Sequence, residues 1–231
     1  MTRPFNRLIN FEQEKEMDKE KIDKKDHILD VAEKIFSDHG YDGASTRMIS
    51  GEAGVNMAML NYYFGSKEGL FLAVFERKIS SFQTLLQNIG ADITMTAWDK
   101  LSLCIDKYVE RIIVNNCFQK LIHREIMKTK RWELTDKLTN ILMVNVREIG
   151  KILEEGVSNG TFSKDTDKEL VIASIFGTKN YIINTPHISS LILGHDVTDE
   201  KYLDDELKPR IKLYMKKLLK AYLMTDNDNT K

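Results

Sequence analysis

The residues best suited to molecular recognition lie together in residues 45–67 of the 231-residue chain. Hydroxyl, amide, guanidinium and ammonium groups of this kind can bind phosphate oxygens and base edges. They are Ser45, Thr46, Arg47, Asn56, Asn61, Tyr63 and Lys67. Whether they act together depends on the elements that position them.

Two short helices around a glycine turn would position these side chains. Ser45 or Thr46 can cap the first helix, because a hydroxyl accepts a hydrogen bond from an otherwise unpaired N–H. The helical spacing of apolar residues predicts that its inward face consists of Met48, Ile49 and Ala53. Gly54 would end this helix, since glycine adopts the left-handed conformation without steric cost.

The second short helix begins after Asn56, which can cap it. We expect this helix to bury Met59, Leu60 and Tyr62 and to expose Met57, Ala58 and Asn61. Ser66 would then cap a longer helix. Two helices joined by a glycine turn are typical of a helix-turn-helix, whose second helix enters a DNA major groove. A packed helical corner without any ligand has the same pattern, so spacing alone leaves both interpretations open.

The surrounding sequence resembles the N-terminal domain of TetR-family transcriptional regulators. The resemblance extends over about fifty residues and includes several separately spaced motifs. They are Ile28-Leu29-Asp30-Val31-Ala32-Glu33-Lys34-Ile35-Phe36, Gly40-Tyr41, Thr46-Arg47-Met48-Ile49, Ala53-Gly54-Val55, and Asn61-Tyr62-Tyr63-Phe64-Gly65-Ser66-Lys67-Glu68-Gly69-Leu70. This resemblance implies an all-helical homodimer that binds an operator and releases it when a small molecule binds.

The resemblance also implies roles for individual residues. Ser45 and Thr46 match positions that contact a phosphate, and Arg47 matches one that reaches a phosphate or a base edge. Tyr63 and Lys67 match phosphate contacts. The exposed recognition surface would comprise Asn56, Met57, Ala58 and Asn61.

Asn61 stands where the family often has an aromatic residue. An asparagine amide can pair with adenine, and a small apolar side chain such as Ala58 or Met57 can contact a thymine methyl. Capping alone is the alternative role for Ser45 and Asn56, and a solvated side chain is the alternative for Lys67. The departure at Asn61 affects base preference rather than entry into the groove.

The overall composition fits an ordinary globular protein. Hydrophobic residues make up 42% and charged residues 30% of the chain, which has three prolines. The sequence has no run of about twenty apolar residues, the length that crosses a bilayer. The charged N-terminus lacks the apolar core of a signal peptide. We therefore expect a cytoplasmic protein that contacts no membrane.

The charge of the chain argues only weakly for DNA binding. The formal net charge is −1, and the segment 24–80 holds seven Lys or Arg against eight Asp or Glu. Many nucleic-acid-binding domains are basic. A helix-turn-helix needs only a local positive face, however, and a dimer doubles the phosphate contacts of one subunit.

Helical periodicity divides the chain into two domains flanked by polar ends. We expect a flexible N-terminal extension (1–23), a helix-turn-helix DNA-binding domain (24–70), a helical ligand-binding and dimerisation domain (71–225) and a flexible tail (226–231). A helix over 66–90 crosses the boundary and would couple the domains. The predicted fold is thus all-α, with an N-terminal three-helix domain followed by a helical bundle.

The second domain shows further helical patterns without any strand signal. They cover residues 96–115, 117–128, 133–158 and 165–185, and a last helix covers 199–224. The segment 187–197 reads as a loop. Pro209 either kinks the last helix or lies in the first turn of a new one.

Residues that suggest catalysis or metal binding lack the required spacing. His39, His123, His187 and His195 show no ligand pattern such as His-Glu-x-x-His. Cys104 and Cys117 form no metal motif, and we expect them to be buried and reduced. No nucleophile elbow is present, so we expect no enzyme, no metal site and no cofactor.

An effector site and a dimer interface are expected in the second domain. Ligand sites in helical bundles form between facing helices, from mostly apolar side chains with few polar ones. The candidate pocket residues are Tyr108, Phe118, His123, Trp132, Met143, Asn180 and Tyr181. The alternative for each is an ordinary core position. The family resemblance implies dimerisation through the last two long helices, here residues 170–181 and 211–223.

The sequence thus predicts a dimeric transcriptional regulator, most consistent with a repressor of a palindromic double-stranded DNA operator. The two reading helices would meet half-sites about 34 Å or a multiple apart. The partners would be the operator, a second copy of the chain and an unidentified small-molecule effector. The alternative is a helical dimeric scaffold protein that keeps this fold without reading DNA.

Overall fold

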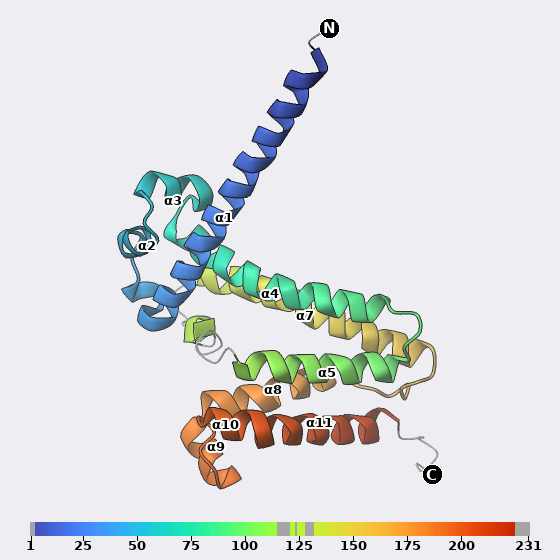
Figure 1. The fold of residues 1–231 in the computed structure, drawn as a ribbon. Helices are drawn as coiled ribbons and strands as arrows, with labels where there is room; N and C mark the ends of the chain where they lie inside the picture. The colour runs from blue at the N-terminus through green and yellow to red at the C-terminus, as the bar shows by residue number, and fades with distance from the viewer. Residues whose placement is uncertain (1–2, 115–120, 123, 128–131, 225–231) are drawn as a thin grey trace, which may run out of the picture. The chain divides into compact units, whose positions relative to one another are not determined.

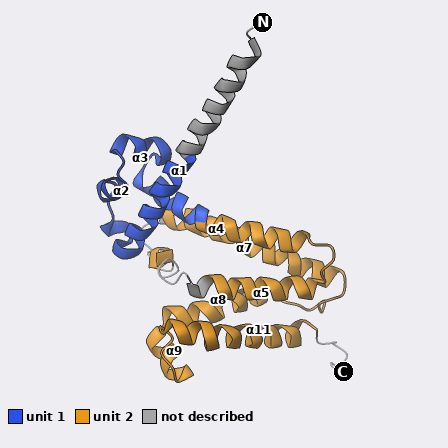
Figure 2. Cartoon of the chain, in the orientation of Figure 1, with its two compact units in different colours: residues 1–77 blue, residues 78–231 orange. Residues whose placement is uncertain are grey.

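The computed structural model describes residues 3–114, 121–122, 124–127 and 132–224, with side chains for 22–111, 121–122, 124–127 and 133–224. Within these ranges the regular elements are helical, and they are labelled in Figure 1. Two compact units comprise residues 1–77 and 78–231 (Figure 2). Their boundary falls inside one continuous helix, α4 (Lys67–Ala91).

The first unit contains α1 (Arg3–Gly43), α2 (Thr46–Glu52), α3 (Met57–Phe64) and the start of α4. The inward stripe of α1 repeats at helical spacing; it consists of Ile28, Leu29, Ala32, Ile35 and Phe36, each at most 8% exposed. Gly40 interrupts α1, because its φ of 71° is incompatible with a right-handed helix.

An aromatic cluster fixes the corner after α1. The ring of Phe36 lies 4.7 Å from that of Phe71 on α4, and Tyr41 lies 4.8 Å from the same ring. Both contacts are close to edge-to-face, the geometry that aromatic pairs favour. The Arg77 guanidinium adds an ion pair to Asp30 on α1 at 2.8 Å. These contacts hold α1 against α4 and leave α2 and α3 supported from behind.

The second unit is a bundle built from α5 (Ala97–Val114), α7 (Trp132–Ser158), α8 (Lys168–Asn184) and α11 (Lys208–Leu223), with the C-terminal part of α4. α5 packs against α7 and α11, and α7 packs against α8 (Figure 1). One apolar core cluster joins these helices and includes Phe82, Leu101, Ile105, Ile149, Ile175 and Met215.

Ion pairs at the edge of this core join helices that are distant in sequence. Lys100 is 4% exposed and binds Glu155 on α7 at 2.8 Å and the carbonyl oxygen of Gly90 at 3.0 Å. Lys216 on α11 binds Asp106 on α5 at 2.7 Å. Because a buried charge is costly unless it is paired, these contacts also fix which helix faces lie together.

The segment predicted to be a loop contains a helix, so that prediction was wrong. α9 (Pro186–Leu193) begins at a proline, whose missing N–H costs nothing in the first helical turn, and it ends at Gly194 with φ 74°. The apolar run Ile188, Leu191 and Ile192 is helical but half to three-quarters exposed. Its buried residue is Ser189, which is polar, so apolar periodicity did not reveal the helix.

The last predicted helix is divided. α10 (Glu200–Tyr202) leads into a π-helical turn, η1 (Leu203–Leu207), and α11 follows with Pro209 in its first turn. Proline has no N–H for the usual bond to the residue four positions earlier, and the wider turn accommodates this loss. Among the described helices, none is long and apolar enough to cross a lipid bilayer.

Candidate nucleic-acid interface and regulatory core

The first short helix is capped as the sequence predicts. The Ser45 hydroxyl accepts a hydrogen bond from the N–H of Met48 at 3.1 Å. Ile49 is fully buried and Ala53 is 6% exposed, so they anchor α2 to the core of the first unit. Gly54 follows with φ 64°, the left-handed conformation expected at this turn.

The second short helix is capped by Asn56, whose side-chain oxygen accepts a hydrogen bond from the N–H of Met59 at 2.8 Å. Leu60 is fully buried and is the anchor of α3. The exposed side chains on this helix are Met57, Ala58, Asn61 and Tyr62. The chain therefore presents a small, mixed apolar and amide face beside a supported helix.

The predicted burial of two residues was wrong. Met48 is 41% exposed and Tyr62 is 77% exposed. Tyr62 follows Leu60 by two residues, which is about 200° around an α-helix, so it cannot share the buried face. Its ring instead lies 5.3 Å from that of Tyr63, almost edge-on. Spacing from the buried leucine would have identified Tyr62 as part of the exposed face, whereas its aromatic character suggested core.

A contact between the two short helices holds Met57 in place. The Ser50 hydroxyl lies 3.2 Å from the carbonyl oxygen of Arg47 and 3.3 Å from the sulfur of Met57. Met57 nevertheless remains 39% exposed. One end of the exposed face is thus fixed by α2 rather than free to move.

The junction between α3 and α4 positions Lys67. Gly65 ends α3 with φ 71°, and the Ser66 hydroxyl accepts a hydrogen bond from the N–H of Gly69 at 3.0 Å. The Lys67 ammonium lies 4.6 Å from the ring centroid of Tyr41, within the range of a cation–π interaction. Lys67 is partly exposed and Arg47 is exposed, so both retain access to solvent.

The predicted pocket residues occupy different environments. Tyr108 is 5% exposed and packs edge-on against Phe176 on α8, with ring centroids 4.9 Å apart. Met143 is 38% and Tyr181 is 50% exposed, and Asn180 is also exposed. The side chains of the other three lie outside the described residues; they are Phe118, His123 and Trp132.

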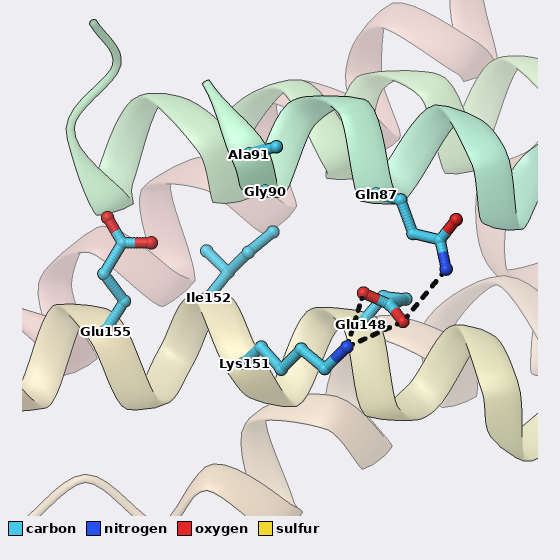
Figure 3. Close-up of a pocket in the computed structure, with 7 residues that line it drawn as sticks. All are labelled: Gln87, Gly90, Ala91, Glu148, Lys151, Ile152 and Glu155. Carbon is cyan, nitrogen blue, oxygen red and sulfur yellow. Dashed lines mark hydrogen bonds and ion pairs between the residues drawn. The ribbon is translucent and has the colours of Figure 1, made fainter. Parts of the chain in front are cut away.

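A surface cleft of about 290 Å³ lies between α4 and α7 (Figure 3). Glu148 in this cleft binds Lys151 at 3.0 Å and Gln87 at 3.5 Å. Glu155 at its other end binds Lys100. Both carboxylates are therefore engaged within the protein, and we assign the cleft a structural role in joining the two helices.

The reactive residue types in the described ranges show no sign of catalysis. Cys104 is buried, which raises the pKa of its thiol to about 12 and keeps it protonated and unreactive. His195 stacks on Tyr202 with ring centroids 4.6 Å apart. His39, His187 and their described neighbours form no group of three or more metal-binding side chains. Cys117 lies outside the described ranges.

Two family models match the chain. Residues 28–74 match the model of bacterial regulatory proteins of the tetR family. Residues 99–209 match the model of the tetracyclin repressor-like C-terminal domain. Together these matches cover both compact units and include α2, α3 and the core around Tyr108.

Curated proteins and solved structures are similar over most of the chain. The fatty acid metabolism regulator protein of Bacillus subtilis is 27% identical, covering 72% of this chain and 85% of the relative. The transcriptional repressor NicS of Pseudomonas putida is 29% identical, covering 79% and 86%. The crystal structure of FadR from Bacillus subtilis with stearoyl-CoA shares the fold, with a TM-score of 0.64, 22% identity and coverage of 82% and 96%.

The matched relatives are regulators of transcription. Of the two hypotheses, the matches therefore support a DNA-binding regulator and not a scaffold protein that keeps the fold without reading DNA. The capped α2–α3 pair lies within the matched N-terminal model. The chain belongs to the TetR family of DNA-binding, ligand-responsive transcriptional repressors.

Proposed function

We propose that α3 reads the operator through Met57, Ala58, Asn61 and Tyr62. The observation that carries this proposal is their common exposure on a helix anchored by the fully buried Leu60. Asn61 can make a bidentate contact to adenine, and the apolar side chains can contact thymine methyl groups. Tyr62 is added to the predicted surface because it is strongly exposed.

The phosphate contacts surround this face. Ser45, Thr46 and Arg47 lie at the start of α2, where free backbone N–H groups favour an anion. Tyr63 and Lys67 flank the α3–α4 junction. Asn56 caps α3 and is exposed, so its amide can serve both roles. These contacts would orient α3 without specifying sequence.

We propose that two chains associate through α8 and α11. α11 carries a second apolar stripe outside its buried one, formed by Tyr214, Leu218 and Tyr222, each about half exposed. On α8 the exposed face runs from Leu170 through Gly177 to Tyr181. A flat apolar face of this kind fits a self-complementary interface, which a twofold dimer requires. Asn180 and Tyr181 then belong to this interface instead of a pocket.

We infer that the effector binds in the core of the second unit and has a large apolar part. Two observations support this: the aromatic pair Tyr108 and Phe176 in an aliphatic core, and 27% identity to a fatty acid metabolism regulator. Effector binding would favour one dimer geometry and move the two reading helices out of register. The operator would then be released.

The test separates base reading from phosphate binding. Genomic fragments bound by the purified protein are selected and sequenced, and affinity for the recovered operator is measured over a salt series. Asn61→Ala is expected to change the preferred sequence. Lys67→Ala is expected to weaken all sequences alike and to lower the salt slope by about one. Identical behaviour of the two variants, or salt-insensitive binding of the wild-type protein, would refute the assignment.

A further inference from the structure

A lysine interrupts the apolar stripe of α8. The buried side chains of this helix are Val171, Ile175, Lys179 and Ile183, and Lys179 is only 2% exposed. Lysine is almost never fully buried in a core without a specific polar environment. Burial lowers the pKa of Lys179 to about 7, because the surroundings disfavour its charge. A lysine at a buried position of an apolar stripe is therefore a candidate for binding a ligand.

The ring of a tyrosine from a second helix lies under this lysine. The Lys179 ammonium lies 5.6 Å from the ring centroid of Tyr108 on α5. Tyr108 is 5% exposed, and burial raises the pKa of its hydroxyl, which therefore stays protonated and can donate a hydrogen bond. Phe176, one turn before Lys179, packs edge-on against the same ring. Tyr108 and Lys179 thus lie next to each other in an aromatic and aliphatic core.

An amide from a third helix belongs to the same layer. Asn145 on α7 is 6% exposed, and its side-chain oxygen has no hydrogen-bond partner in the described part of the chain. It precedes the core residue Ile149 by one turn, so it lies on the inward face of α7. A buried amide oxygen without a partner costs about 1–3 kcal/mol, which a bound molecule could offset.

The pairing of α7 with α8 places this amide near the lysine. Lys168 binds Glu154 at 3.1 Å, and a side chain added at Gly150 would contact Ile172 at 3.9 Å. The two helices are thus antiparallel, and a step towards the N-terminus of α7 is matched by an equal step towards the C-terminus of α8. Five residues further along each helix, Asn145 is opposite Gly177, within one helical turn of Lys179.

We propose that Tyr108, Asn145 and Lys179 bind the carboxylate of an amphiphilic effector whose apolar body lies in the surrounding core. This inference rests on the proposed function, because it specifies the ligand of the regulatory core. An ammonium, a phenol and an amide that can rotate to present its NH2 group offer donors from three helices. A carboxylate has two oxygens that accept such bonds and one charge that matches one lysine.

The apolar surroundings determine the rest of the ligand. Phe82 and Phe176 lie next to Tyr108, and Ile149 and Ile175 continue the same core. A strongly hydrated dianion such as a phosphate would lose more hydration free energy on burial here than its interaction with one lysine could offset. A cationic ligand would be repelled by Lys179. The geometry therefore favours a monocarboxylate on a hydrocarbon chain.

The experiment compares head groups on one chain length. Dodecanoate, dodecanoyl-CoA and dodecanol are titrated into the full-length protein by calorimetry, and release of the selected operator is measured in parallel. The proposal predicts tightest binding of dodecanoate. Lys179→Met is expected to weaken the binding of dodecanoate by at least about tenfold, as for a lost charged hydrogen bond, and to leave the affinity for dodecanol unchanged.

Lys100→Met is the matched control, since Lys100 is a comparably buried lysine that pairs with Glu155 outside this cluster. It is expected to keep the preference for dodecanoate. Asn145→Leu, which retains the side-chain volume while removing the amide, should also weaken the binding of dodecanoate. Equal binding of dodecanoate and dodecanol, a preference for the CoA thioester, or no binding of any of the three would overturn the proposal.

Failure of this inference can be told from failure of the proposed function. Salt-sensitive binding of the free protein to its operator is measured without any effector. If that binding fails, the DNA-reading assignment is wrong, whatever the carboxylate titration gives. If operator binding is normal and Lys179→Met leaves dodecanoate binding intact, the carboxylate site alone is wrong.

Discussion

The backbone N–H of Asp167 donates a hydrogen bond to the Tyr222 hydroxyl at 3.0 Å. Asp167 caps α8, and Tyr222 lies in the last turn of α11. The backbone N–H of Ser163 adds a second link, to the carbonyl oxygen of Leu223 at 2.7 Å. The start of α8 is therefore fixed to the end of α11, and these are the two helices of the proposed dimer interface.

Leu218→Glu should disrupt the proposed dimer. Leu218 is 46% exposed in the outward stripe of α11, and a buried, unpaired carboxylate at a twofold interface would face its own copy. Analytical ultracentrifugation is expected to show a shift from dimer to monomer and a large loss of operator affinity. Ile93→Glu is the control, because Ile93 is 97% exposed outside both helices. A dimeric Leu218→Glu protein would place the interface elsewhere.

Tyr62→Ala should weaken operator binding without unfolding the protein. The side chain is 77% exposed, so its removal is expected to change the free energy of unfolding by less than about 0.5 kcal/mol. Loss of its contact with DNA should reduce affinity about tenfold, in line with the cost of losing one base-edge contact. Fluorescence anisotropy and denaturant unfolding measure the two effects. Unchanged affinity would exclude Tyr62 from the interface.

Gly69→Ala should destabilise the corner between α3 and α4. A Cβ at this position would overlap the carbonyl oxygen of Phe64, so the backbone would have to move. We expect a cost of about 1–3 kcal/mol, as for an overpacked site. Gly51→Ala in α2 is the matched control, because its Cβ would meet no atom within 4 Å. It should be neutral or stabilise by up to about 1 kcal/mol. Equal melting temperatures for the two variants would contradict this account.

Lys179 should make stability depend on pH above neutrality. Burial lowers its pKa to about 7 in the folded protein, from the 10.5 of an ordinary lysine. Between these values the unfolded chain binds more protons, so the wild-type free energy of unfolding should rise as pH increases from 7 towards 10. The Lys179→Met variant has no titratable group at this position. Its free energy of unfolding at pH 7 should therefore exceed that of the wild type by more than about 1.4 kcal/mol, the equivalent of one pKa unit.

Urea unfolding of both proteins at several pH values tests this expectation. The difference in free energy of unfolding between wild type and Lys179→Met should shrink as the pH rises from 7 towards 10. A constant difference between wild type and Lys179→Met would mean that the buried lysine keeps its proton throughout.

The sequence was sufficient to predict the reading element. Caps at Ser45 and Asn56 and left-handed glycines at 54 and 65 are local features, and each is present. The orientation of Tyr62 was missed because an aromatic ring suits both core and interface. For such a residue, angular distance from a buried anchor is more informative than residue type.

The second unit was less predictable because its important features depend on helix packing. Lys179 looked like any solvated lysine, and the burial of Asn145 becomes evident only when α5, α7 and α8 are assembled. The exposed positions of Asn180 and Tyr181 likewise follow from which face of α8 packs inward. Periodicity locates helices, but it does not assign a function to a polar residue within an apolar stripe.

The wide turn at Leu203–Leu207 sets the rotational phase of the helix that follows it. Deleting one residue there would restore ordinary helical winding and turn α11 by about 100° about its own axis. Such a rotation would bring a different side of α11 to the surface without altering any residue on it. Small changes in the length of this linker would therefore offer related proteins a route to new subunit arrangements.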